Sequence, residues 1–578
     1  MDGDVNTESF LQSSLGRLRS HLQQREEQVF LVLTLLIGAL VGLTVVAFIV
    51  LTERSGMRLY PVGSAAWRRV LIPIAGSLGM GFLLYRYFPN ARGSGVPQTK
   101  AALYTREGYI SLRTVLGKFF CTSATLASGI PLGREGPSVQ VGAGIASVLG
   151  RRLGLKPEKV KALIPVGAAA AIAAAFNTPM AAVLFSLEEV MGDLHAPVLG
   201  SVVLASATSW MMLRLFLGNE PLFRVPQYEL VHPVEFGIYA VLGVAGGLLS
   251  AAFTRLLLEM RKRFLMLPRK TQWWHPVVGG VVVGLMGLLV PQVLGVGYAY
   301  VGDALNGNMA LRLMLILIVL KLFAITTSYA SGNAGGIFGP SLFLGAMLGG
   351  AIGHVAHHYL PGHTATQGAY ALVGMGALFA GIVRAPMTSV LMIFEMTRDY
   401  AVIVPLMIAN LASLFISSRL QRQPIYEALA HQDGIHLPSF HSKSYAETNT
   451  VAHIMQSASE TLGARAKIQD AADQINVSML RSSLVLDEGA IIGILSRAEI
   501  LDALGAGKGE QEVRSLIADL DFPHLHKDHP LHFALERMSR AHLDTLPVVS
   551  RNDVHRLEGI VTLQDVLAAY GIDATGVS

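Results

Sequence analysis

Long apolar runs recur along the first three quarters of the chain and stop near Pro424. Several approach or exceed the roughly 20 residues that an α-helix needs to cross the hydrocarbon core of a bilayer. They begin at Val29, Val198, Phe236, Val277 and Leu311. Shorter runs between them are broken by Gly and Pro, and the sequence after Pro424 mixes charged and apolar residues. The pattern predicts a polytopic α-helical membrane domain followed by a soluble region.

The composition supports a membrane protein, because 52% of the residues are hydrophobic and only 15% are charged. No nucleophile-and-base arrangement and no Gly-Lys-Ser/Thr phosphate loop is present, so we expect no enzyme activity. Basic loops facing anionic lipid account for the net charge of +5 without a nucleic-acid partner. The single cysteine, Cys121, lies in an apolar segment and is expected to pack there.

Basic residues flank the first apolar run and set the expected topology. The polar segment 1–28 contains Arg17, Arg19 and Arg25, and the run that follows is too long for a cleavable signal. Under the positive-inside rule, this segment is predicted to be cytoplasmic.

Two motifs of the membrane region occur twice, in the same order. "PMAAVLFSLE" from Pro179 matches "PMTSVLMIFE" from Pro386, and each follows an earlier Gly-Pro pair that ends at Pro137 or Pro340. The spacing is nearly equal in both copies. We therefore predict a duplicated membrane domain, whose matched broken helices indicate a transport site near the bilayer midplane.

The segments "GREGP" and "GGIFGP" place helix starts inside the membrane, at about Pro137 and Pro340. Unpaired N–H groups and the positive end of the helix dipole make such starts binding sites for anions. A carboxylate at Glu135 would compete with the anion and, when protonated, release it. The alternative is a first-turn carboxylate that merely offsets the dipole.

A second pair of acids, Glu188 and Glu189, ends the first copy of the "PM" motif. Glu188 has a counterpart in Glu395 and is assigned to the shared scaffold. Glu189 corresponds to Met396, so it is the candidate for proton delivery, with an ordinary interfacial charge as the alternative. Ser94 lies between two glycines and is a candidate anion donor. Tyr426, at the end of the membrane region, is ambiguous by itself.

Taken together, "GSGVP" at Gly93, "GREGP" at Gly133, "GGIFGP" at Gly335 and "RAPMTSVLMIFEMT" at Arg384 resemble the CLC family of chloride channels and proton/chloride exchangers. The resemblance covers about Val29 to Tyr426. It implies an inverted repeat of tilted, broken helices, assembled as a homodimer with one pore per subunit.

The resemblance also implies roles for single residues. Chloride is expected at the Ser94 hydroxyl, the Tyr426 hydroxyl and the backbone amides of Ile337 and Phe338. Glu135 corresponds to the external gating glutamate. Glu189 corresponds to the internal proton glutamate, whose presence accompanies exchange rather than passive conduction.

Two features of the membrane region fit this assignment less directly. "GSGVPQTK" has Gln98 and Lys100 where bacterial exchangers often carry acids, which alters the local electrostatics. His354, His357 and His358 have helical spacing, but nothing nearby completes a zinc shell, so no metal site is predicted.

The soluble region carries its own repeat, "GILSRAEIL" from Gly493 and "GIVTLQDVL" from Gly559, which resembles a pair of CBS domains. In that family the hydroxyl and the acid can hold the ribose of an adenine nucleotide. The candidates are Ser496, Thr562 and Asp565, with Glu499 in place of the usual aspartate in the first copy. Helix capping alone is the alternative, and no cofactor is required.

We therefore expect a proton-coupled chloride antiporter of bacterial type, an integral protein of the inner membrane with cytoplasmic termini. The alternatives are a passive gated chloride channel, whose gate responds to voltage or pH, a CBS-regulated divalent-cation transporter, and a protein that chiefly senses nucleotides. The expected domains are an N-terminal segment 1–28, a membrane domain 29–426, a linker 427–449, and CBS domains 450–508 and 509–578.

Overall fold

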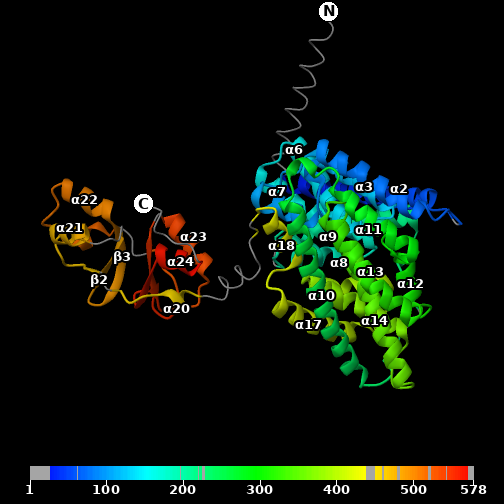
Figure 1. Ribbon diagram of the computed structural model, residues 1–578. Coiled ribbons are helices and arrows are strands. Elements are labelled where there is room, and N and C mark those ends of the chain that lie inside the picture. Colours follow the sequence, from blue (N-terminus) through cyan, green and yellow to red (C-terminus); the bar gives the residue numbers. More distant parts are fainter. Residues whose placement is uncertain are drawn as a thin grey trace, which may run out of the picture. The chain divides into compact units, whose positions relative to one another are not determined.

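The computed structural model divides the chain into two compact units, Met1–Leu437 and Pro438–Ser578, which are described separately (Figure 1). The described residues are 26–61, 63–194, 197–218, 221–223, 225, 228, 230–435, 437, 450–458, 461–477, 482–517, 522–541 and 543–570. Most of the predicted N-terminal segment and much of the predicted linker lie outside these residues.

In the part that the structure describes, the first unit consists of helices and connecting loops and contains no β-strand. Its α-helices are α2 Glu26–Leu59, α3 Arg68–Arg86, α4 Val96–Thr105, α5 Leu112–Ala127, α6 Glu135–Arg152, α7 Pro157–Phe176, α8 Pro179–Phe185, α9 Leu199–Leu217, α10 Glu235–Met266, α11 His275–Leu289, α12 Tyr298–Leu305, α13 Leu311–Ala330, α14 Phe338–Tyr359, α15 Gln367–Val383, α16 Pro386–Thr397, α17 Ile403–Leu420 and α18 Ile425–Gln432. Shorter turns are η1 Pro89–Ala91, the π-helix η2 Ser186–Met191, η3 Arg269–Thr271 and η4 Pro291–Val293.

Among the described residues, 7 helices are long and apolar enough to cross a membrane. They include α2, α9, α10 and α13, where the sequence predicted spans. The run from Val277 forms the shorter helix α11. Cys121 is fully buried in a small apolar cluster with Leu84, Ala91 and Ala334, which confirms its packing role.

Helix packing in one half of the unit is repeated in the other. Helix α6 packs on α7 as α14 packs on α15, α2 on α9 as α10 on α17, and α5 on α6 as α13 on α14. Across the halves, α8 contacts α16 and α3 contacts α11. Contacts between equivalent elements are those that a two-fold relation produces. The predicted duplication is therefore confirmed.

The first unit extends past Tyr426, because α18 continues to Gln432 and packs on α4, α10 and α15. Its last turn is tied down by Arg261, which donates to Gln432 Oε1 at 2.9 Å and pairs with Asp433 at 2.5 Å. Residues assigned from sequence to the start of the linker are thus part of this helix. Gln432 and Asp433, at the end of α18, hold this helix in place through their contacts with Arg261.

The second unit contains two small sheets flanked by helices. Its elements are α20 Val451–Ile454, β1 Thr461–Gly463, α21 Ile468–Val477, β2 Ser482–Asp487, β3 Ala490–Ser496, α22 Arg497–Gly505, η5 Val513–Leu516, α23 Leu531–Ala541, β4 Thr545–Val549, β5 Leu557–Thr562 and α24 Leu563–Ala569. Strand β1 pairs parallel with β2, β2 pairs antiparallel with β3, and β4 pairs antiparallel with β5. The strand-then-helix units β3–α22 and β5–α24 match the two copies of the sequence repeat.

Candidate functional site

Two helix starts meet in the middle of the first unit. The backbone N–H and C=O of Gly133 exchange hydrogen bonds of 2.7 Å with those of Gly336, so the loops before α6 and α14 are joined. The helices begin at Glu135 and Phe338, two residues before the prolines at which the sequence placed them. A proline in the first turn is tolerated there, because N–H groups of that turn have no acceptor within the helix.

The carboxylate of Glu135 is completely buried and lies across the first turn of α14. Its Oε2 accepts a 3.3 Å hydrogen bond from the N–H of Gly339, and its Oε1 accepts one from the hydroxyl of Tyr298 on α12. The acid therefore occupies the positive end of a helix from the opposite half. The sequence predicted that Glu135 competes with an anion at the start of its own helix, whereas the structure places the carboxylate at the start of α14.

The amides of Ile337 and Phe338 lie at this same helix start. Ile337 is the N-cap residue of α14 and Phe338 its first residue, and both are buried. The Phe338 ring packs against Phe176 and Phe379, with ring centroids 4.8 and 4.4 Å apart. The helix start is thus walled by aromatic carbon, which keeps the dielectric low and strengthens the attraction of its N–H groups for an anion.

Ser94 and Tyr426 supply two buried hydroxyls that lie close to each other without forming a hydrogen bond. Both residues are fully buried, and neither Ser94 Oγ nor Tyr426 Oη has a hydrogen-bond partner among the described residues. A buried hydroxyl without a partner costs free energy, so such groups are satisfied by a partner or a ligand. Two hydroxyl donors in one place suit an anion.

The loop that carries Ser94 is held from several sides. The backbone N–H of Ser94 donates to the hydroxyl of Tyr329 at 3.1 Å, and the Nζ of Lys118 donates to Gly93 O at 2.5 Å. Gly95 has φ +107°, and a Cβ there would lie 2.2 Å from Gly136 O. Only glycine permits this approach of the Ser94 loop to the start of α6. The Ser94 loop and the Glu135 region are therefore packed backbone against backbone.

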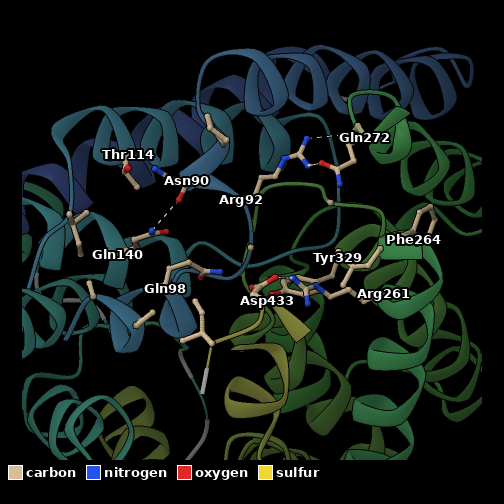
Figure 2. A pocket seen from close by; sticks show the side chains of 18 of the residues that line it. Asn90, Arg92, Gln98, Thr114, Gln140, Arg261, Phe264, Gln272, Tyr329 and Asp433 are labelled. Carbon is tan, nitrogen blue, oxygen red and sulfur yellow. Dashed lines mark hydrogen bonds and ion pairs between the residues drawn. The ribbon is translucent and has the colours of Figure 1, made fainter. Parts of the chain in front are cut away.

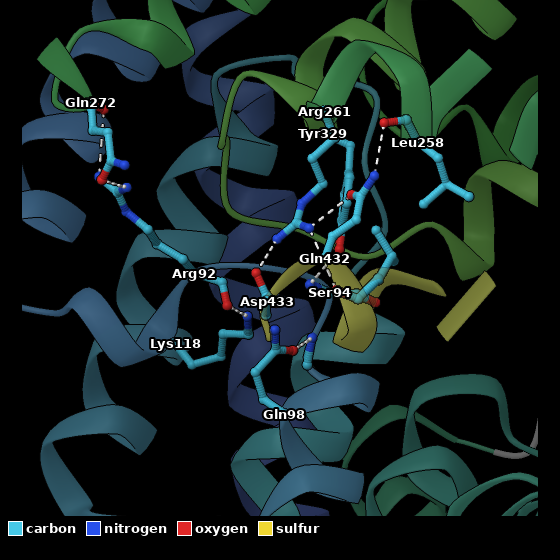
Figure 3. A network of polar contacts seen from close by, with 12 residues as sticks. Arg92, Ser94, Gln98, Lys118, Leu258, Arg261, Gln272, Tyr329, Gln432 and Asp433 are labelled. Carbon is cyan, nitrogen blue, oxygen red and sulfur yellow. Dashed lines mark hydrogen bonds and ion pairs between the residues drawn. The ribbon is translucent and has the colours of Figure 1, made fainter. Parts of the chain in front are cut away.

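A cavity of about 390 Å³ adjoins this loop (Figure 2). Gly93 and Gln98 line it beside Arg92, Tyr329 and Asp433. Figure 3 shows the contacts of Arg261 with Asp433 and Gln432, which link α10 to the end of α18. Tyr329, whose hydroxyl accepts from the Ser94 N–H, lines the same cavity as Arg261 and Asp433.

Glu188 and Glu395 cap each other's helices. Glu395 accepts from the N–H groups of Met180 at 3.0 Å and Ala181 at 2.7 Å, at the start of α8. Glu188 accepts from the N–H groups of Met387 at 3.3 Å and Thr388 at 2.8 Å, at the start of α16. The two matched acids therefore satisfy helix ends, as the repeat suggested.

Glu189, the unmatched acid, is buried and forms a 2.8 Å ion pair with Lys100. The pair joins η2 to α4, the helix that follows the Ser94 loop. The residue that departs from the expected motif therefore contacts the candidate proton glutamate. The sequence identified both residues but not their pairing.

The sequence did not predict three contacts of the site: Tyr298 with Glu135, Tyr329 with Ser94, and Lys118 with the Ser94 loop. Lys118 carried a signal, since a lysine in an apolar helix needs polar partners. The tyrosines carried none, because each contacts its partner from far along the chain.

In the second unit, Ser496 with Glu499 and Thr562 with Asp565 form capping boxes. Thr562 Oγ1 donates to Asp565 Oδ2 at 2.6 Å, and Asp565 Oδ1 accepts from Gln456 at 2.6 Å. The predicted capping is confirmed. Among the described residues, no group of three or more His, Cys, Asp and Glu side chains is placed to hold a metal ion.

Residues 76–418 match the family model described as "Voltage gated chloride channel", and residues 451–506 and 513–571 each match the CBS domain. An "H(+)/Cl(-) exchange transporter ClcA" of Vibrio cholerae serotype O1 (strain M66-2) is 32% identical over 416 residues, which cover 70% of this chain and 89% of that protein.

Two solved structures are similar as well. A "slow cyanobacterial Cl-/H+ antiporter" superposes with a TM-score of 0.65 and 26% identity, covering 70% of this chain and 97% of that one. A "eukaryotic CLC transporter" superposes with a TM-score of 0.60 at 20% identity, covering 95% of this chain and 98% of the other. The second likeness concerns the fold alone.

Proposed function

Because this chain belongs to the voltage-gated chloride channel family, we propose that it exchanges chloride for protons across a membrane. It is a multi-pass membrane transporter with a CBS pair, and not an enzyme. The observation that carries the proposal is the place of the Glu135 carboxylate, across the first turn of α14 beside the amides of Ile337 and Phe338. An acid and an anion compete for that helix start.

Chloride binds between the Ser94 and Tyr426 hydroxyls and the α14 amides in this proposal. When Glu135 is a carboxylate, it blocks the pathway. Protonation removes its charge, weakens its hold on the helix dipole and lets chloride take its place. The proton that Glu135 releases comes from Glu189, which takes it up on the cytoplasmic side. Chloride can occupy the position of the Glu135 carboxylate only when this carboxylate has taken up a proton. The proposal is that this coupling makes chloride and protons move in opposite directions.

A passive gated chloride channel on the same fold is the alternative. It would use the same anion ligands but move no protons through Glu189. A divalent-cation transporter is disfavoured, because the helix starts of α6 and α14 direct positive dipole ends into the site. A site for divalent cations would instead need carboxylates whose negative charge no helix dipole or nearby cation offsets.

The test is a simultaneous record of external chloride and external pH during efflux from chloride-loaded liposomes. Exchange predicts proton movement coupled to chloride efflux in the unmodified protein. Glu135→Gln should abolish proton coupling, and Glu189→Gln should abolish it while chloride still moves. Glu188→Gln is the matched control, because its carboxylate caps α16. Chloride efflux without linked proton movement would support the channel instead.

We also propose how the transporter assembles and how it is regulated. The transporter forms a homodimer in the lipid bilayer of the bacterial inner membrane. Both termini of each subunit lie in the cytoplasm. An adenine nucleotide would bind the CBS pair at Thr562 and Asp565, or at Ser496. Since these side chains already cap helices, binding would have to replace part of each capping box, and isothermal titration with ATP tests it.

A further inference from the structure

Lys100 and Glu189 form an ion pair inside the membrane unit, and the proposed transport mechanism gives this pair a consequence. Lys100 Nζ lies 2.8 Å from Glu189 Oε1, and the two side chains are only 9% and 8% exposed. Charges removed from water are costly to leave unpaired. Each partner therefore stabilises the ionised form of the other.

The surroundings of Glu189 are otherwise acidic. Glu427 on α18 and Glu188 on η2 both add negative charge near it, whereas Lys100 supplies the positive charge that acts on it most strongly. The hydroxyl of Tyr426 lies within electrostatic reach of the same carboxylate. Glu427 also interacts with the Arg384 guanidinium, and Glu188 caps α16, whereas Lys100 is paired directly with Glu189, so its removal changes the charge next to this carboxylate most directly.

We propose that Lys100 is the counter-ion that sets the proton affinity of Glu189 and thereby the cytoplasmic pH at which exchange operates. The inference rests on the proposed function, because it assumes that protons pass through Glu189. Lys100 is a positioning residue here: it touches the proton carrier and not chloride.

Proton uptake at Glu189 must break this pair. A proton from water adds to the carboxylate, the charge-assisted hydrogen bond from Lys100 is lost, and the ammonium keeps its own proton while its counter-charge disappears. Uptake therefore requires a higher proton concentration than it would beside a neutral residue. Helix α4 connects the ion pair to the proposed chloride site, because it carries Lys100 and the Ser94 loop leads directly into it.

The experiment measures proton-coupled chloride flux in liposomes as a function of the pH on the cytoplasmic face, from about pH 5 to about pH 8. Lys100→Gln removes the charge and should move the half-maximal pH upward by about one unit or more, a tenfold lower proton concentration. Lys100→Arg keeps the charge and should retain the wild-type profile. Arg106→Gln removes an exposed cation at the C-cap of the same helix and should leave the profile unchanged.

An unshifted profile in Lys100→Gln, with chloride flux and elution volume intact, would overturn the inference. Lys100→Met, which keeps the apolar stem, takes its place if the Gln variant does not assemble. Glu189→Gln distinguishes the proposed proton route from the proposed role of Lys100. Retained proton movement in that variant refutes the proton route itself. Lost proton movement in Glu189→Gln combined with an unshifted Lys100→Gln refutes only the role of Lys100.

Discussion

The hydroxyl of Tyr298 donates a hydrogen bond to Oε1 of Glu135, while the N–H of Gly339 holds Oε2 of the same carboxylate. Two donors from the second half of the chain thus keep the carboxylate over the start of α14. Arg134 adds to this arrangement, since its guanidinium lies 5.6 Å from the centre of the Tyr298 ring and 3.2 Å from Glu53. The proposed gate, Glu135, is therefore held by specific contacts as well as by the dipole.

Tyr298→Phe should therefore loosen the closed gate. A hydrogen bond to a charged group contributes about 1.5–3 kcal/mol, so chloride should compete with Glu135 roughly 10- to 150-fold better. Isothermal titration of the purified protein with chloride measures this gain. Tyr300→Phe, on the same helix, should leave the affinity as it is. A Tyr298→Phe protein with wild-type chloride affinity would show that the hydroxyl does not hold the gate.

The reciprocal caps predict a stability effect without a transport effect. Glu188→Ala and Glu395→Ala each leave two backbone N–H groups at a helix start without an acceptor, at a cost of about 1–3 kcal/mol. Both variants should lower the thermal unfolding temperature in detergent by similar amounts. Neither should change the number of protons moved per chloride. A change in that ratio would mean that the caps take part in proton transfer.

The Arg261–Asp433 pair predicts a link between the end of α18 and the chloride site. Because α18 is only 8 residues long and carries Tyr426, freeing its last turn should weaken chloride binding. Arg261→Asp and Asp433→Arg should each lower chloride affinity. The double reversal should recover part of the loss, with a coupling energy of about 1 kcal/mol. Strictly additive losses would show that the pair does not hold the helix.

His529 predicts acid sensitivity in the CBS unit. Burial lowers its pKa below the ordinary value, and the nearby charges of His526 and Arg537 act in the same direction, against an opposite effect from Asp528. Since its Nδ1 accepts a 3.2 Å hydrogen bond from the N–H of His526, the neutral ring is the form that fits. A lowered pKa means that the folded state binds fewer protons. Stability is therefore fully present above the unfolded pKa of about 6.5 and is lost as the pH falls from there through the lower pKa of the folded state.

Hydrogen exchange of the full-length protein at about pH 7.5 and about pH 5.5 tests this effect. Backbone N–H groups at Val451 and Ala452, which donate to His529 O and Lys527 O, should exchange faster in acid. His529→Asn keeps an acceptor near the position of Nδ1 but does not titrate, so its exchange should depend less on pH. Equal pH dependence in the two proteins would assign the effect to another group.

The sequence predicted the parts of the site that lie in short motifs or in the repeat. Glycines and prolines marked the two helix starts and Glu135 at the first of them, the family resemblance supplied Ile337 and Phe338 at the second, and the comparison of Glu188 with Glu395 separated scaffold from candidate carrier. What it missed depends on contacts between segments without a shared motif. Tyr298 reaches Glu135 across 163 residues, and Tyr329 reaches Ser94 across 235. In the sequence, a tyrosine in an apolar helix cannot be distinguished by whether its hydroxyl contacts a buried carboxylate or a lipid headgroup.

Lys100 lies between these cases. Its residue type marked it as unusual, yet nothing local indicated that a helix of 10 residues would aim it at η2. The helix boundaries shifted for a similar reason. Proline restricts its own φ and lacks an N–H, but it does not say which residue before it already has helical geometry.

The reciprocal caps also constrain how the protein is made. The first turn of α8 is complete only when Glu395 has been synthesised, 215 residues after Met180. At roughly 5–20 residues per second, a ribosome needs roughly 10–40 s for that interval. During this time the N–H groups of Met180 and Ala181 must be held by water or by the insertion machinery. We therefore expect the first half, made alone, to lack the cap of α8 until the second half has been synthesised.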